Sequence, residues 1–505
     1  MAVIGAIIKG LINLRGVVVP NPAPEKDQEK VLRQLLEKAK DTAFGKHYKF
    51  SEILAADDVK KAFASTIPYF DYNRIHREWW SKLHEGEENV TWPGKPPYYA
   101  LSSGTTGTSS KRIPVTEDMI EAIRQTGIKQ VGALVNYDLP ADFFEREIMM
   151  LGSSTDLQQV EDHQEGEISG ISASNIPFWF RSFYKPGMEI AQIEDWDERI
   201  LEIAKKARDW DIGAITGIPT WTELMIKKII EYHKVETIHD VWPNLEVYSS
   251  GGVAFDTYEK SFNELLARPV TIIDTYLASE GFLAFQERPE TTAMRLVTDN
   301  GIYFEFVPFK PEYIEEDGAL VPDAPLVSLN EVKEGEDYVL VISTVSGLWR
   351  YIIGDTVAFT DVDRKEIKIT GRTKFFLNTL GEQLSVNKMN HAVTELENEF
   401  SIKIPEFTMA VLRNEKGFLH RWYLGVIGEA RESELADALD TVLRNTNKAY
   451  RSARDKALKS VEVVVLSPDM FYEWNAKNKK KGGQVKMEKV MKEDKLTDWE
   501  DFLGL

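Results

Sequence analysis

The chain has 505 residues, of which 43% are hydrophobic, 11% aromatic and 28% charged. This composition is typical of a soluble globular protein and excludes a mini-scaffold, a collagen-like chain and a disordered chain. The 61 basic and 81 acidic residues give a formal net charge of -20, which repels a phosphate backbone, so we expect no nucleic-acid partner. The sequence contains no cysteine, which excludes disulfides, thiolate nucleophiles and cysteine-bound metals. Any catalysis therefore uses carboxylates, lysine, arginine, hydroxyls or the backbone.

The apolar segment 1–15 is too short to span a bilayer, and no basic segment precedes its apolar run. We expect a core helix there, with an amphipathic membrane-surface helix as the alternative. No other stretch approaches a transmembrane span. We therefore expect a cytoplasmic protein, and a monomer or a weak dimer.

Helices and strands alternate between Asp195 and Tyr276. Pairs of a capping residue and a glutamate three positions later predict helix starts, and short apolar runs predict buried strands. The expected helices begin at Asp195, Thr220 and Asp256, and the expected strands are 212–216, 245–249 and 270–275. This alternation predicts a mainly parallel sheet covered by helices, with ligands at the carboxyl ends of its strands.

The pattern after Gly281 is antiparallel. The run 295–306 contains a hairpin turn at Asp299-Asn300-Gly301, and the run from Tyr338 to Ser343 is interpreted as a further antiparallel strand. From about residue 387, we expect a helix, strands at 407–413 and 421–427, a long helix, a strand at 461–466 and then a basic tail. This order predicts a small α+β domain of roughly 125 residues.

The segment from Leu101 to Pro114 is the most informative for chemistry. Eight consecutive small residues at 102–109 let backbone amides approach an anion, hydroxyls add donors, and Lys111 adds positive charge. The spacing of Gly104, Gly107 and Lys111 does not fit the ATPase P-loop. From composition alone, a phosphate-binding loop and a plain surface loop are equally compatible with this segment.

Six short motifs follow one another along the chain. They are Ser102 to Gly107 with Lys111 to Pro114, Tyr276 to Gly281, Gly347 to Asp355, Gly371-Arg372 with Gly381 to Gln383, Asn447 to Tyr450 with Arg454, and Gly482 to Lys486. In this order they resemble the motifs of the plant auxin-responsive acyl acid amido synthetases and their bacterial homologues, a branch of the adenylate-forming superfamily. The resemblance extends from about residue 44 to the end.

The resemblance implies an α/β fold with two parts. The first is a large N-terminal domain at 1–378, made of mixed sheets and helices with a β-barrel-like subdomain. The second is a small, mobile α+β domain at 379–505.

The implied function is that of an ATP-dependent ligase. It adenylates a small carboxylic acid with release of pyrophosphate and then transfers the acyl group to the amine of an amino acid, giving an amide and AMP. ATP and Mg2+ are the implied cofactors. Two alternatives remain: transfer to coenzyme A or another thiol, and a nucleotide-binding protein without catalysis.

The resemblance also implies roles for particular residues. The expected nucleotide-binding residues are Ser102, Ser103, Thr105, Thr106, Gly251, Gly252, Tyr276, Ser279, Asp355 and Arg372. Tyr276 would stack on adenine, Asp355 would accept hydrogen bonds from the ribose hydroxyls, and Arg372 would contact ribose and phosphate. Glu280 would hold Mg2+. Without the resemblance, these residues are compatible with ordinary turns and surface charges.

Two further segments, Leu151 to Thr155 and Gly217 to Trp221, are expected to wall the acyl pocket, with core packing as the alternative. The expected catalytic residues are Lys111, Glu280 and Lys486. Rotation of the small domain about 371–381 would bring Lys486 to the charge that builds on the α-phosphate. After this lysine the family usually continues x-proline-arginine, whereas this chain has Lys486-Met-Glu-Lys489. Lys481 is therefore the alternative for the catalytic lysine. The other interpretation of this segment is a solvated basic tail.

Replacing Lys486 tests this assignment. Lys486→Ala is expected to lower the rate of adenylation roughly 10²- to 10³-fold, because one electrostatic contact to the transition state is lost. Acid-dependent pyrophosphate exchange measures the rate, and Lys481→Ala serves as the comparison. Exchange at the wild-type rate in Lys486→Ala would refute the role of this lysine.

Overall fold

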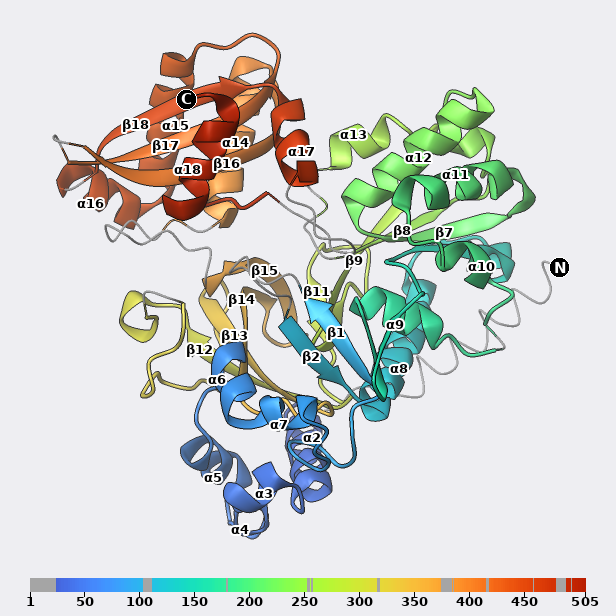
Figure 1. Cartoon of the computed structure of the whole chain (residues 1–505), viewed down its shortest axis with the longest axis vertical. Helices are drawn as coiled ribbons and strands as arrows, with labels where there is room; N and C mark the ends of the chain where they lie inside the picture. Colours follow the sequence, from blue (N-terminus) through green and yellow to red (C-terminus); the bar gives the residue numbers. More distant parts are fainter. Residues whose placement is uncertain are drawn as a thin grey trace.

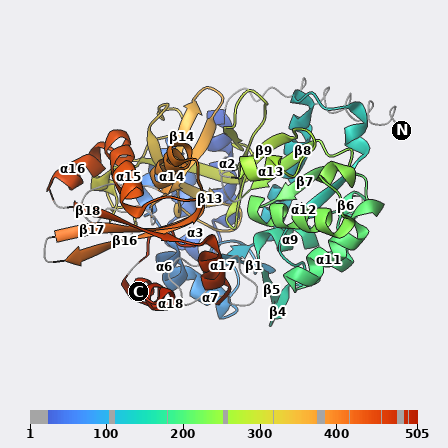
Figure 2. The same cartoon turned by 90° about the horizontal axis from the view of Figure 1, so that it is seen from above.

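The chain was analysed as a computed structural model, which describes residues 24–102, 111–178, 180–251, 255, 258–315, 318–373, 384, 386–414, 417–456, 458–477, 487–491 and 493–505. These residues form an eleven-stranded, a four-stranded and a three-stranded sheet with helices around them (Figure 1). Figure 2 shows the parallel strands and their helices toward one end and the C-terminal elements toward the other. The mixed α/β fold expected from the sequence is confirmed.

The eleven-stranded sheet has the order β12-β13-β14-β15-β11-β10-β9-β8-β7-β3-β6. From β6 to β9 the neighbouring strands are parallel, and from β9 to β12 they are antiparallel. The change of direction after Gly281 is thus as predicted. The strands are β3 (Glu147–Leu151), β6 (Tyr184–Lys185), β7 (Ile212–Gly217), β8 (Val247–Gly251), β9 (Thr271–Ala278), β10 (Gly281–Phe285), β11 (Met294–Leu296), β12 (Ile302–Pro308), β13 (Asp337–Thr344), β14 (Tyr351–Asp361) and β15 (Glu366–Arg372).

Helices cover the parallel half, as expected. The principal ones are α8 (Glu117–Ala133), α9 (Ile168–Ser174), α10 (Met188–Ala191), α11 (Trp196–Lys206), α12 (Pro219–His233) and α13 (Glu259–Asn263). Asp195 caps α11 by accepting the N–H of Glu198 at 2.8 Å. Helix α12 begins one residue earlier than predicted, because Pro219 occupies its first turn, where a missing N–H costs nothing. Apolar residues of α11 and α12 pack with β7 and β8 in one core, which includes Ile203, Ile226 and Tyr248.

The predicted hairpin at Asp299-Asn300-Gly301 is wrong. Strand β11 lies between β10 and β15, whereas β12 pairs with β13. Gly301 does have a left-handed φ of 72°, but the Asn300 side chain donates to the Ala122 carbonyl at 2.6 Å and to Thr126 at 2.7 Å, both on α8. The turn is docked on a helix, and the two strands it joins pair with different neighbours.

The N-terminal helices pack on the antiparallel half through the largest core. They are α2 (Pro24–Ala39), α3 (Ala43–His47), α4 (Phe50–Leu54), α5 (Val59–Thr66), α6 (Tyr72–Ile75), the π-helix η1 (His76–Trp80) and α7 (Ser81–His84). A buried ion pair anchors them: Nε of Arg350 lies 3.1 Å from Glu305, with side chains 5% and 2% exposed. The same guanidinium donates to the carbonyls of Ala64 at 2.8 Å and Ile67 at 2.5 Å, around the end of α5. It also lies 4.2 Å from the centre of the Tyr69 ring.

The four-stranded sheet has the order β2-β1-β5-β4. Its strands are β1 (Tyr98–Ser102), β2 (Lys111–Val115), β4 (Gln158–Val160) and β5 (His163–Gly166). Strands β1 and β2 are antiparallel, with Ser102 opposite Lys111. The predicted phosphate loop therefore connects two paired strands, and its residues 103–110 lie outside the described ones.

The C-terminal strands and helices expected up to residue 466 are confirmed, but the expected basic tail contains two helices. The elements are α14 (Val386–Phe400), β16 (Lys403–Asn414), β17 (Gly417–Ile427), α15 (Glu432–Thr446), α16 (Lys448–Lys456), β18 (Leu458–Leu466), α17 (Pro468–Lys477) and α18 (Glu493–Leu503). Phe471 of α17 and Trp499 of α18 are fully buried against each other, with ring centres 5.3 Å apart. Their apolar side chains stabilise these two helices, which contain one lysine each. The boundary predicted at 378/379 and the helix predicted at 1–15 lie outside the described residues.

In the described part of the chain, helices that combine the length and the apolarity needed to cross a membrane are absent.

The buried ion pair can be tested by unfolding. Arg350→Met is expected to lower the free energy of unfolding by about 3–5 kcal/mol, because it leaves the Glu305 carboxylate buried without its partner. Burial raises the pKa of Glu305, so this loss is expected to shrink at low pH, where the carboxyl becomes neutral, and to grow as the pH rises through that pKa.

The double variant Arg350→Met/Glu305→Leu provides the control. It is expected to recover most of the lost stability, since a packed apolar pair carries no desolvation penalty. Urea denaturation measures all three proteins. A single variant as stable as the wild type would show that the pair anchors nothing.

Candidate active site

Eight of the thirteen predicted site residues lie in the described part of the chain. They are Ser102, Lys111, Gly251, Tyr276, Ser279, Glu280, Asp355 and Arg372. The other predicted residues lie outside it, namely Ser103, Thr105, Thr106, Gly252 and Lys486, together with the alternative Lys481. The roles given to these five stay predictions.

Three of the predicted residues meet at the carboxylate of Asp355. Asp355 on β14 lies directly opposite Arg372 on β15, and Nε of Arg372 donates to Oδ1 at 2.6 Å. The hydroxyl of Tyr276, on β9, donates to the other oxygen, Oδ2. The Asp355 side chain is 11% exposed. Residues of β9 and β15 thus bind the two oxygens of a carboxylate that β14 carries.

The contacts among Tyr276, Asp355 and Arg372 determine the charges of these side chains. The neighbouring Asp355 raises the pKa of Arg372, which stays protonated. Burial first, and then the charge of Asp355, raise the pKa of Tyr276, which stays a neutral donor. An ionised carboxylate offers about four lone-pair positions, so Asp355 retains capacity to accept from a ribose. Tyr276 is 5% exposed, and the stacking of its ring on adenine stays a prediction.

Glu280 and Lys111 form the second part of the site. Glu280 lies with the half-buried Ser279 in the turn between β9 and β10, and the residue is 7% exposed. Burial raises the pKa of Glu280, and the positive charge of Lys111 opposes this shift more than any other neighbour. Lys111 begins β2, where the predicted phosphate loop ends. The structure therefore brings together the carboxylate and the lysine that were expected to handle metal and phosphate.

Gly251 ends β8 beside Thr275 of β9. A Cβ atom at Gly251 would lie 2.8 Å from the Thr275 hydroxyl oxygen, which itself donates to the Ser250 carbonyl at 2.8 Å. Close strand approach is thus the reason the structure gives for this glycine. The contact with a purine stays a prediction.

Both segments expected at the acyl pocket follow neighbouring parallel strands. Leu151 ends β3 and pairs with Gly217, which ends β7. In the first segment, the Thr155 amide donates to the Ala191 carbonyl at 2.9 Å, and the Ser154 hydroxyl donates to the Gln192 carbonyl at 3.1 Å. Both segments lie at the carboxyl edge of the sheet, where β8 and β9 also end. Contact with an acyl group stays a prediction.

Two tyrosines of this region were not predicted. The Tyr72 hydroxyl accepts the N–H of Arg112 at 3.0 Å, and the Lys111 ammonium lies 5.4 Å from the centre of its ring. No sequence signal connects Tyr72 with Lys111, which lies 39 positions later. Tyr351 lies on β14 four positions before Asp355. A bulge between Ile352 and Thr356 interrupts the alternation of side chains there, so the spacing alone does not relate the two residues. The signal that was available is that both belong to the predicted motif from Gly347 to Asp355.

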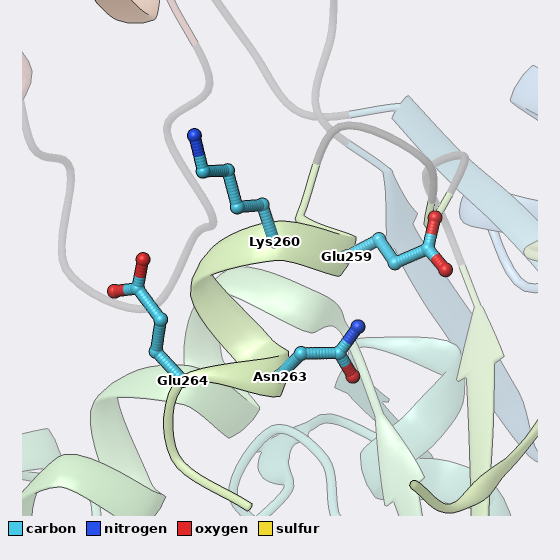
Figure 3. Close-up of a pocket in the computed structure, with 4 residues that line it drawn as sticks. All are labelled: Glu259, Lys260, Asn263 and Glu264. Carbon is cyan, nitrogen blue, oxygen red and sulfur yellow. The ribbon is translucent and has the colours of Figure 1, made fainter.

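The described residues contain no group of three or more histidine, aspartate or glutamate side chains that would hold a metal. A cation at Glu280 would therefore depend on oxygens from a ligand and water. A separate hollow lies at α13, lined by Glu259, Lys260, Asn263 and Glu264 (Figure 3). Its Glu264 forms an ion pair with Lys403 of β16 at 3.3 Å. The predicted site residues do not line this hollow.

Comparison with known proteins matches the chain to three domain models of one family. They are the GH3 family N-terminal domain at residues 22–203, the central domain at 295–372 and the C-terminal domain at 387–495. Together they match most of the chain.

Among curated relatives, the indole-3-acetic acid-amido synthetase GH3.8 of Oryza sativa subsp. indica is 26% identical over 253 residues, which are 46% of this chain and 41% of that protein. The jasmonoyl--L-amino acid synthetase GH3.5 of Oryza sativa subsp. japonica is 27% identical over 252 residues, 46% of this chain and 43% of the other. The matched segments thus span less than half the length of these relatives.

Solved structures resemble nearly the whole chain. The AtGH3.15 acyl acid amido synthetase in complex with 2,4-DB has a TM-score of 0.76 at 17% identity, covering 94% of this chain and 93% of that one. A 2-hydroxyisobutyryl-CoA ligase in the postadenylation state has a TM-score of 0.59 at 12% identity, covering 96% and 93%. At such identities the likeness shows the fold.

Proposed function

The chain belongs to the GH3 family, and on that premise we propose that it is an ATP-dependent acyl acid amido synthetase. It would adenylate a small carboxylic acid and transfer the acyl group to the amine of an amino acid. The observation that carries the proposal is the meeting of Tyr276, Asp355 and Arg372, with Glu280 and Lys111 beside them, at the edge where the parallel strands end. In open α/β sheets, ligands bind outside that edge.

The proposed nucleotide contacts follow from this arrangement. Asp355 would accept hydrogen bonds from the ribose hydroxyls while Tyr276 and Arg372 hold its orientation. Arg372 is 45% exposed, and its bond to Asp355 fixes the plane of its guanidinium. A guanidinium has five donors in a fixed fork, which suits it to reach a phosphate from this position.

Glu280 has the properties expected of a residue that would hold Mg2+. It is a hard oxygen ligand within the field of Lys111, and its buried carboxylate has a raised pKa. A nearby cation stabilises the ionised form and so offsets the cost of burial. The metal would neutralise the negative charge of the triphosphate.

The proposed reaction has two steps that need alignment more than a side-chain nucleophile. An oxygen of the acid carboxylate attacks the α-phosphorus, and the bond to pyrophosphate breaks. The amine nitrogen then attacks the acyl carbon, the bond to AMP breaks, and the nitrogen loses a proton. Since the sequence has no cysteine, the acyl group would be carried on AMP rather than on an enzyme thiol. We keep Lys486, the loop hydroxyls and the domain boundary at 378/379 within this proposal.

A thiol acceptor is the second candidate, because a CoA ligase has the same fold over nearly the whole chain. The match to the GH3 family models and the names of the relatives, which are amido or amino acid synthetases, favour the amine. The relatives' names include indole-3-acetic acid and a jasmonoyl group, which suggests an organic acid as substrate.

A panel of carboxylic acids tests the proposal. Incubation with Mg2+ and ATP is expected to release pyrophosphate in the presence of the correct acid. Addition of mixed amino acids, or of coenzyme A in a parallel reaction, is then followed by mass spectrometry of the product. An amide with AMP is the expected result, and a thioester would establish the second candidate. No acid-dependent pyrophosphate release from a broad panel would refute adenylation.

The pH dependence tests the role of Glu280. The affinity for ATP with Mg2+ is expected to fall as the pH is lowered through the raised pKa of Glu280, because only the ionised carboxylate binds the cation. Glu280→Gln is expected to bind Mg2+ and ATP weakly and to lose that dependence. Calorimetry between about pH 5 and pH 8 measures both proteins, with a chelator-treated sample as the control. The same pH dependence in the glutamine variant would rule out Glu280 as its source.

A further inference from the structure

The hydroxyl of Tyr351 is an unpaired polar group in the middle of the protein. Tyr351 is 0% exposed, and its hydroxyl has no hydrogen-bond partner among the described residues. Leaving such a group unpaired costs stability, and most buried polar groups in native proteins are paired. A group that supplies the missing partner on binding would explain why a tyrosine and not a phenylalanine stands here.

The ring is held so that the hydroxyl cannot turn to solvent. It stacks on Trp80 with ring centres 6.0 Å apart and planes at 28°. The backbone on both sides is bonded to Phe70, whose N–H donates to the Arg350 carbonyl at 3.0 Å and whose carbonyl accepts from Ile352 at 2.8 Å. A rigid strand therefore presents the hydroxyl in one place.

The surroundings of the hydroxyl belong to the proposed metal and phosphate end of the site. After burial, the charge of Glu280 is the largest influence that raises the pKa of Tyr351, followed by Asp71. Tyr351 is therefore a neutral phenol that can donate a proton to an anion. Asp71 already accepts the N–H of Arg74 at 2.8 Å, and the Tyr72 hydroxyl already accepts from Arg112.

Ring contacts link Tyr351 to the lysine of the site. Tyr351 stacks on Trp80, the ring centres of Trp80 and Tyr72 are 6.0 Å apart, and the Lys111 ammonium lies 5.4 Å from the centre of the Tyr72 ring. A ribose bound at Asp355 would place a triphosphate that runs toward Glu280 and Lys111 in the direction of Tyr351.

We propose that the Tyr351 hydroxyl donates a hydrogen bond to a phosphate oxygen at the metal-bound triphosphate end of ATP. This inference rests on the proposed function and adds a binding residue to it. Tyr351 would be a contact that AMP does not make, because AMP lacks the outer phosphates.

Tyr351→Phe tests the contact, since it removes the hydroxyl and keeps the ring on Trp80. The probe is the non-hydrolysable analogue α,β-methylene ATP with Mg2+, titrated by calorimetry without acid or amine. The variant is expected to bind it roughly 10- to 100-fold more weakly, as loss of a hydrogen bond to a charged group predicts, and to bind AMP as the wild type does. The melting temperature without nucleotide is expected to stay the same or rise, because an unpaired buried hydroxyl has been removed.

Tyr338→Phe is the matched control. Tyr338 is also buried, on the neighbouring strand β13, but its hydroxyl accepts the N–H of Lys333 at 3.0 Å and donates to Glu336 at 3.2 Å. This variant is expected to melt at a lower temperature and to bind the analogue normally.

Three results would overturn the inference. Unchanged analogue binding in Tyr351→Phe would exclude the contact, and equal losses for the analogue and AMP, or a lower melting temperature, would assign the hydroxyl a structural role. Measurements on the wild type distinguish a failure of the Tyr351 proposal from a failure of the proposed function. If the wild type binds the analogue and releases pyrophosphate, only the role of Tyr351 is refuted; if it binds no nucleotide, both proposals fall.

Discussion

The buried ion pair of Arg350 and Glu305 is the contact on which the proposed site depends. Arg350 has a left-handed φ of 43°, a conformation that side chains with a Cβ rarely adopt and that costs energy. Its guanidinium is bonded to Glu305 and to two carbonyls around the end of α5, so several contacts hold the strained residue in place. A buried ion pair adds little net stability, because desolvation offsets the attraction, but its geometry is strongly specified. The pair therefore fixes where β14 begins.

The position of β14 then sets the site. Its first residue, Tyr351, packs on Trp80, and Asp355 follows four positions later, within a bulge of the strand. Just before it, Trp349 is fully buried and its indole N–H donates to the Thr91 carbonyl at 3.0 Å. The motif from Gly347 to Asp355 thus combines two tasks: its first half anchors the strand to the N-terminal segment, and its second half presents polar groups. This division explains why a motif that resembles a ribose-binding signature contains so many buried apolar residues.

Local signals in the sequence predicted local structure well. Asp195 caps a helix because its side chain reaches an N–H three residues later, and β7 is a short apolar run that ends at glycine. The pairing of Asp355 with Arg372 was not predictable, because it depends on the register between β14 and β15, which bulges shift twice. The docking of Asn300 on α8 is likewise a contact between segments about 175 positions apart. The contact between Phe471 and Trp499, which are 28 positions apart, also depends on tertiary packing and not on a local pattern.

The charge balance of the chain bears on the kind of ligand that the proposed site would accept. The net charge of -20 repels an anionic nucleotide, and the described site holds two carboxylates, Glu280 and Asp355, beside two cations, Lys111 and Arg372. Since Arg372 is bonded to Asp355 and the field of Lys111 acts on Glu280, much of this positive charge is already balanced within the site. A triphosphate would gain little from it alone. A divalent cation held by Glu280 would change this balance, because it would neutralise the carboxylate and the phosphates together and leave the charge of Lys111 available to the ligand.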